Sequence, residues 1–249
     1  ARFVRQQSGG APAFNSTAVV PTEAFAARRS SGLRRGDSAG GSAGRPPRPT
    51  EDAIELGLAW IARHQMADGS WSLTNFHTGR PGYANEHTAQ LSSDTAGTGL
   101  SLLCFFGAGY HHRDDRYQDN IRRGLEWMLQ HQGEDGNLYV SQDEESNKAA
   151  ALYSHGIGTI ALCEGYGMTQ DPKLKVAAQK AIDFIVKAQN KDRGGWRYAP
   201  GIGSDTSVSG WMVMALKSGQ LAGLKVPEET YQKVTKWLDT AKGGRGQEH

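Results

Sequence analysis

A helical stripe that occurs three times restricts the fold more than any other feature of this sequence. Each stripe ends in a glutamine, and a glycine follows four to six residues later. Counted back from the glutamine, positions −7 and −4 are apolar and position −5 is aromatic in all three copies, so the apolar positions line one side of a helix. The three glutamines are Gln65, Gln132 and Gln189.

A second helix is predicted after each stripe. The three segments open with a hydroxyl residue four positions before a glycine and continue in an apolar run, at 95–106, 154–163 and 206–216. Because they are apolar nearly all round, these helices should pack inside, whereas the stripe helices carry charges on one face and should lie outside. The sequence therefore predicts an all-α chain, an α/α toroid of helical hairpins with inner and outer helices. The repeats cover about 51–110, 119–168, 172–222 and, in part, 227–249, so we expect an incomplete ring.

Residues 1–50 have a different composition. They contain eight Arg, no Lys and two acids, a net charge of +6, and they are rich in Gly, Ser and Pro. Such a segment has too few large apolar groups to offset its ordering entropy, so it is predicted to be a disordered basic tail or linker ahead of a repeat domain at 51–249. Its arginines are scattered, which favours a solvated tether over a contact with a membrane surface or with nucleic acid.

The sequence gives little information about the cellular location of the protein. No apolar run reaches the roughly 18 residues that a membrane span requires, and two cysteines are too few for a disulfide framework. Residue 1 is Ala, so we expect a preceding segment. The predicted location is the cytoplasm, or a membrane to which that preceding segment tethers the domain.

The glutamine motifs resemble those of a known family. Gln65 to Trp71 matches the QxxxGxW motif of squalene-hopene and oxidosqualene cyclases, Gln132 to Leu138 matches it with Leu in place of Trp, and Gln189 to Trp196 matches it with one extra residue. Over about 51–244 the chain thus resembles these cyclases, the β subunits of protein prenyltransferases and the cyclase-repeat proteins of bacteria. The resemblance implies a barrel of paired helices in which the motif is structural. The motif residues are Gln65, Gly69, Trp71, Gln132, Gly136, Gln189, Gly195 and Trp196.

The catalytic signature of the cyclases is incomplete here. They protonate an alkene with an Asp of a DxDDTA motif, and in the matching stretch Asp94 is retained while Ser93 takes the place of the proton-donating residue. Asp205 opens the third inner helix in the same way. Both acids are explained as N-caps, where the helix dipole favours the ionised form. The catalytic candidates are these two residues and His155, for which hydrogen bonding within a loop is the alternative.

No metal or cofactor is predicted. The Asp-x-Cys pair with which prenyltransferases hold zinc is missing, and Cys104 and Cys163 align with Ala215, which indicates a small-residue packing position. A ligand cavity is expected where the inner helices begin, lined by Tyr153 and Trp211, and Glu164 could face it.

Three functions fit this pattern. The favoured one is a repeat domain that binds an isoprenoid or another apolar ligand, or a protein partner. The second is an active terpenoid cyclase or prenyl-transfer enzyme that uses other residues. The third is a carbohydrate-active α/α barrel with paired carboxylates.

Overall fold

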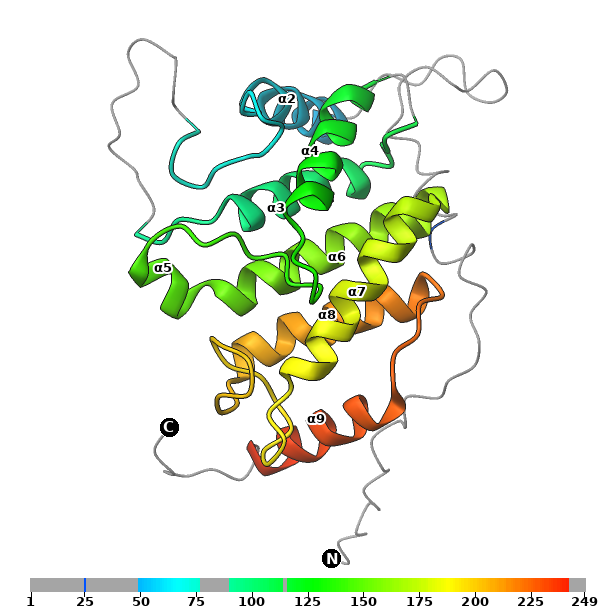
Figure 1. Cartoon of the computed structure of the whole chain (residues 1–249). Helices are drawn as coiled ribbons and strands as arrows, with labels where there is room; N and C mark the ends of the chain where they lie inside the picture. The colour runs from blue at the N-terminus through cyan, green and yellow to red at the C-terminus, as the bar shows by residue number, and fades with distance from the viewer. Residues whose placement is uncertain (1–24, 26–48, 77–89, 114–115, 242–249) are drawn as a thin grey trace, which may run out of the picture.

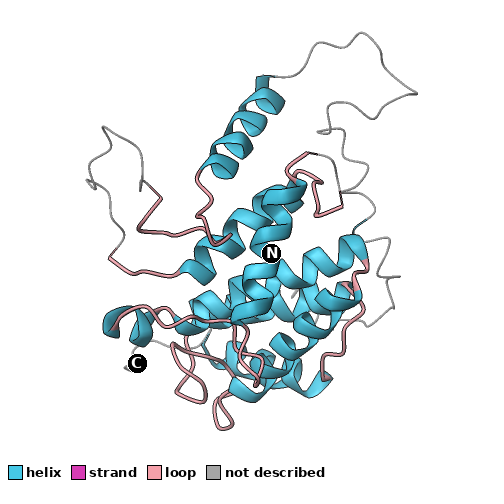
Figure 2. Ribbon diagram, turned by 45° about the horizontal axis from the view of Figure 1, so that its top comes forward, coloured by secondary structure: helices cyan, strands magenta, loops and turns pink. Residues whose placement is uncertain are grey.

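The computed structural model describes residues 25, 49–76, 90–113 and 116–241, and these residues form helices and loops without any strand (Figures 1 and 2). The all-α prediction is confirmed for this part of the chain. Its helices are α2 (Pro49–Arg63), α3 (Asp94–Gly107), α4 (Gln118–His131), α5 (Glu144–Ala149), α6 (Ala151–Thr169), α7 (Pro172–Ala188), α8 (Thr206–Leu221) and α9 (Glu228–Ala241).

Helix α6 lies at the centre of the molecule, between α3 and α8 (Figure 1). It is buried along almost its whole length because its sequence is apolar nearly all round. Glycines allow close packing: a Cβ on Gly158 would lie 3.3 Å from a side-chain atom of Thr95 in α3, and one on Gly156 would lie 3.4 Å from Trp211 in α8. The helices α3, α6 and α8 are the three that the sequence places inside.

The helices α4, α7 and α9 pack against this central layer, and α2 contacts α3. Their starting residues differ. Asp171 caps α7, since its carboxylate accepts a hydrogen bond from Lys173 N at 2.9 Å and Pro172 occupies the first turn. Helix α4 instead follows Tyr117, which has a left-handed backbone (φ 59°) and makes no side-chain cap.

Phe25 joins the core from the segment that composition assigns to a disordered tail. It is helical and 3% exposed, and its ring lies directly on Gly167 of α6. A Cβ at residue 167 would collide with that ring, so the phenylalanine can pack here only because residue 167 is a glycine. Composition gives no sign of this contact, and the rest of residues 1–48 lies outside the described part of the chain.

None of the described helices is both long and apolar enough to cross a membrane.

Candidate functional site

The three glutamines join each outer helix to the next one. Gln65 Nε2 donates to Gly69 O at 2.8 Å within its own loop and to Asn120 O at 2.9 Å in α4. One amide group thereby closes the loop and attaches it to the neighbouring hairpin. The other two glutamines repeat this pair of bonds, Gln132 Nε2 to Gly136 O (3.2 Å) and Ala177 O (2.9 Å), and Gln189 Nε2 to Gly194 O (2.7 Å) and Thr230 O (3.0 Å).

A glycine with positive φ follows each glutamine, because a backbone carbonyl of the next outer helix lies against it. The φ angles of Gly69, Gly136 and Gly194 are 100°, 96° and 88°. A Cβ on Gly194 would lie 2.5 Å from Lys233 O, and the other two glycines face backbone carbonyls of α4 and α7 in the same way. The third member of this set is therefore Gly194, one residue before the predicted Gly195.

The residue two positions after this glycine attaches the loop to the next inner helix. Trp71 N donates to Thr98 Oγ1 and Trp196 N donates to Ser209 Oγ, both at 2.9 Å. The indole nitrogens of the two tryptophans also donate to carbonyls of their own outer helices at 2.8 Å. In the second repeat, where Leu138 replaces the tryptophan, the acceptor is an imidazole instead of a hydroxyl.

His155 provides that imidazole. Its Nδ1 lies 3.1 Å from Leu138 N and must accept that hydrogen, so Nε2 carries the ring proton and donates to Ala181 O at 3.1 Å. The ring is fully buried, and burial lowers its pKa from 6.5 to about 4. The catalytic candidate His155 is thus held as a neutral crosslink between α6, α7 and the second loop, with both nitrogens bonded.

The two acidic candidates occupy different positions at their helix starts. Asp205 caps α8, as predicted, because its Oδ1 accepts from Val208 N at 2.9 Å. The prediction is wrong for Asp94, since Ser93 caps α3 and the Ser93 hydroxyl also lies 2.7 Å from Ser154 Oγ of α6. Asp94 instead accepts a bond from Gln142 at 3.2 Å.

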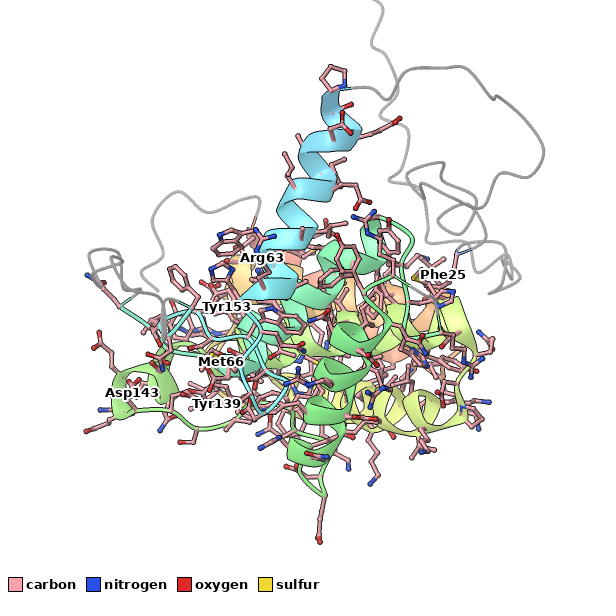
Figure 3. The ribbon with its side chains drawn as sticks, turned by 90° about the horizontal axis from the view of Figure 1, so that it is seen from above. Phe25, Arg63, Met66, Tyr139, Asp143 and Tyr153 are labelled. Carbon is pink, nitrogen blue, oxygen red and sulfur yellow. The ribbon has the colours of Figure 1, made fainter. Side chains whose placement is uncertain are left out.

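Of the three cavity candidates, Glu164 lies apart from Tyr153. Tyr153, labelled in Figure 3, is half-buried near the start of α6. Its ring centroid lies 6.2 Å from that of Tyr198. Glu164 is buried 11 residues further along the same helix, about 16 Å at a rise of 1.5 Å per residue. Trp211 is half-buried in α8.

An apolar groove lies between α2 and α3, away from the predicted cavity. Its volume is about 320 Å³, and Ile54, Leu58, Ile61, Cys104 and Ala108 line it together with two glycines. No lining side chain carries a charge, and the Cys104 thiol holds the one heteroatom among them.

The prediction that both cysteines are buried packing positions is wrong for Cys104, which lines this groove. Cys163 is fully buried, as a packing position should be, and so is Ala215, but Cys104 is exposed. Partial burial nevertheless raises the pKa of the Cys104 thiol.

A buried carboxylate holds α2 to the rest of the molecule. Glu55 accepts hydrogen bonds from the Tyr110 hydroxyl at 2.6 Å and the Tyr117 hydroxyl at 3.3 Å, and Arg116 pairs with it at 2.9 Å. Burial, followed by the neighbouring carboxylate, raises the pKa of Tyr110 to about 12. The sequence gives no clear signal of this cluster, because Glu55 shares its side of α2 with two further acids, Glu51 and Asp52.

Among the described residues, no group of three His, Cys, Asp or Glu side chains is arranged to hold a metal ion. The chain matches no protein-family model, no curated protein and no solved structure.

Proposed function

We propose that this chain is a helical-repeat binding domain of the terpene-cyclase and prenyltransferase type, and that the groove between α2 and α3 holds an isoprenoid chain. The three glutamine motifs support the family and its α/α toroid. The groove, which this proposal takes as the ligand site, supports an apolar ligand.

The lining of the groove is the observation that carries the proposal. Small-molecule sites have volumes of about 300 to 1,000 Å³, and this groove, at about 320 Å³, is large enough for part of an extended hydrocarbon chain. Each buried CH₂ contributes about 0.8 kcal/mol. With no charged group to orient a polar substrate, the contact favours an apolar chain over a sugar or a nucleotide.

Binding without turnover fits the state of the candidate catalytic groups. Both ring nitrogens of His155 bond to protein backbone, and Asp205 bonds to the first turn of its helix. Neither group lines the groove. The proposal therefore assigns no chemical step to them.

Two glycines of the groove allow a direct test. A Cβ on Gly57 or Gly107 would meet no atom within 4 Å, so a larger side chain there would fill the groove without a clash. Gly57→Leu should block the ligand, whereas Gly210→Leu, at a glycine of α8 that also faces open space, is the matched control.

The readout is the rate at which iodoacetamide alkylates Cys104, followed by intact-protein mass, with and without farnesol. We expect farnesol to slow the alkylation at least fivefold in the wild type and in Gly210→Leu, and to have no effect in Gly57→Leu. Buried Cys163 is the internal check that the protein stays folded. An unchanged alkylation rate at saturating farnesol in the wild type would exclude the groove as an isoprenoid site.

A further inference from the structure

The outer helices share a set of positions that receive the loop of the preceding hairpin. These receiving positions lie 12, 9 and 5 residues before the residue at the glutamine position. They lie on one face of a helix because they are separated by three and four residues. They are Asn120, Arg123 and Trp127 in α4, Ala177, Lys180 and Phe184 in α7, and Thr230, Lys233 and Trp237 in α9, where Lys242 holds the glutamine position.

In α4 all three receiving positions contact the preceding loop. Asn120 O accepts from Gln65, and the Arg123 guanidinium donates to two carbonyl oxygens of the loop at 2.9 and 2.8 Å. Trp127 Nε1 donates to the Asp68 carboxylate at 3.2 Å, and the tryptophan is 3% exposed.

Helix α2 has the same three positions, and all three are exposed. They hold Ala53, Leu56 and Trp60; the leucine is 72% and the tryptophan 44% exposed. Figure 3 shows α2 projecting from the body of the molecule, with Arg63 at the end that meets the body. This stripe lies beside the face of α2 that lines the groove, and none of the three residues lines the groove.

We propose that the stripe Ala53, Leu56 and Trp60 is a docking surface for the segment that follows α9 in a second copy of the chain. The loops of Gln65, Gln132 and Gln189 are already docked within their own chain. The sequence after α9 repeats their spacing, with Lys242 at the glutamine position and Gly246 four residues later. A lysine amine donates hydrogen bonds to backbone carbonyls as the glutamine amide does.

A basic residue before the glycine is compatible with docking, because in the third loop Arg193 precedes Gly194 and the middle receiving position of α9 is Lys233. In the first two loops the residue before the glycine is an acid, Asp68 or Asp135, and the middle receiving position is basic, Arg123 or Lys180. After α9 the residue before the glycine is Arg245, and on α2 the middle receiving position is Leu56. The segment after α9 thus resembles the basic third loop, and α2 offers it a receiving helix with an apolar residue at the middle position.

Such a contact joins the end of α9 in one copy to α2 of the next. The interface is head-to-tail, so association continues into a closed ring or a longer chain of copies. It does not depend on the proposed ligand, because the groove and the stripe lie on neighbouring faces of α2.

The experiment is sedimentation equilibrium of the full chain over a wide concentration range. We expect the wild type to associate. Leu56→Lys removes the most exposed apolar side chain of the stripe and should weaken association at least tenfold. Gly246→Val should do the same, because a Cβ at the corresponding glycines would strike a helix carbonyl. Val176→Lys, which changes a 61% exposed residue of α7 outside the stripe, is the matched control and should associate like the wild type.

An equal mixture of Leu56→Lys and Gly246→Val separates this contact from the alternatives. Each variant keeps one intact surface, so the mixture should form dimers that neither variant forms alone. A wild type that stays monomeric at every concentration would overturn the proposal. A Gly246→Val variant that associates normally would overturn it too, since that result indicates a symmetric contact between two α2 helices.

Discussion

Helices α2 and α4 have the same local chemistry and different surroundings. In each, a tryptophan stacks on a histidine four residues later, with ring centroids 3.9 Å apart for Trp60 and His64 and 4.4 Å for Trp127 and His131. Each histidine also bonds through Nδ1 to the carbonyl of its tryptophan. Nevertheless Trp60 is 44% exposed and Trp127 is 3% exposed.

The difference arises from the preceding hairpin. Trp127 is covered by the loop that carries Asp68, whereas the ring centroid of Trp60 lies 6.4 Å from that of Phe76 and the tryptophan stays 44% exposed. Burial in this fold is therefore a property of neighbouring repeats, as in other stacked-repeat proteins, where each unit is stabilised mainly through its interfaces. The predictions below test how much of the stability lies in those interfaces.

The largest effect on the free energy of unfolding is expected when a side chain is added where one hairpin packs on the next. In Gly136→Val the new side chain would need a left-handed backbone and would collide with Lys180 O of α7, so we expect a loss of at least about 4 kcal/mol in the free energy of unfolding. Gly201→Val is the matched control, since Gly201 also has positive φ but nothing within 4 Å of its Cβ position. The control should lose only the backbone strain, about 1 to 2 kcal/mol.

Urea denaturation with a common m-value measures both losses. Equal losses in the two variants would show that backbone strain, and not the packing of one hairpin on the next, makes the glycine necessary.

A second effect should distinguish the middle repeat from the other two. Only His155 among the three loop acceptors is titratable, because Thr98 and Ser209 are hydroxyls. The imidazole titrates near 6.5 when unfolded and at about 4 when folded, so the unfolded state binds more protons between these values. Stability is then complete above about pH 6.5 and falls as the pH decreases towards 4, by about 3 kcal/mol in total.

The measurement is the difference in unfolding free energy between wild type and His155→Gln at pH 7.5 and at pH 4.5. The glutamine can accept from Leu138 N and donate to Ala181 O but does not titrate. Other acid-sensitive groups, such as Asp171, whose pKa is lowered by its hydrogen bonds to Lys173 N and His112, are common to both proteins and cancel. The gap between the proteins should shift in favour of the glutamine variant at low pH, and a constant gap would contradict the neutral buried state.

The sequence predicts those parts of this structure that depend on local spacing. The helix stripes, the all-α class and the cap at Asp205 follow from periodicity and from side chains that bond within one turn. The same reasoning placed the cap of α3 on Asp94 because it could not weigh two adjacent capping residues, and Ser93 gains a second bond from α6 that is invisible in sequence.

What the sequence could not supply are contacts between distant segments. The position of His155 depends on its hydrogen bond to Leu138, which lies in a loop outside α6. Phe25 packs on Gly167, more than a hundred residues later in the sequence. The groove likewise depends on where α2 rests on α3, so it could not be predicted from either helix alone. Cys104 is exposed for the same reason.

The smallest effect on global stability is expected at the attachment of α2. Glu55→Ala removes the acceptor for Tyr110, Tyr117 and Arg116, and an unpaired buried hydroxyl costs about 1 to 3 kcal/mol. Because few residues of α2 pack on the core, that cost should fall on the attachment of this helix alone. Amide hydrogen exchange should therefore accelerate about tenfold in α2, while the free energy of unfolding of the rest of the molecule, measured in urea, changes by less than about 0.5 kcal/mol.

Glu126→Ala, which breaks an exposed ion pair with Arg122 on α4, is the control and should leave hydrogen exchange in α2 unchanged. The alternative outcome is that the global free energy of unfolding falls by as much as the free energy of local opening in α2. That result would mean that α2 unfolds together with the later helices, so that α2 and α4 differ in exposure and not in stability.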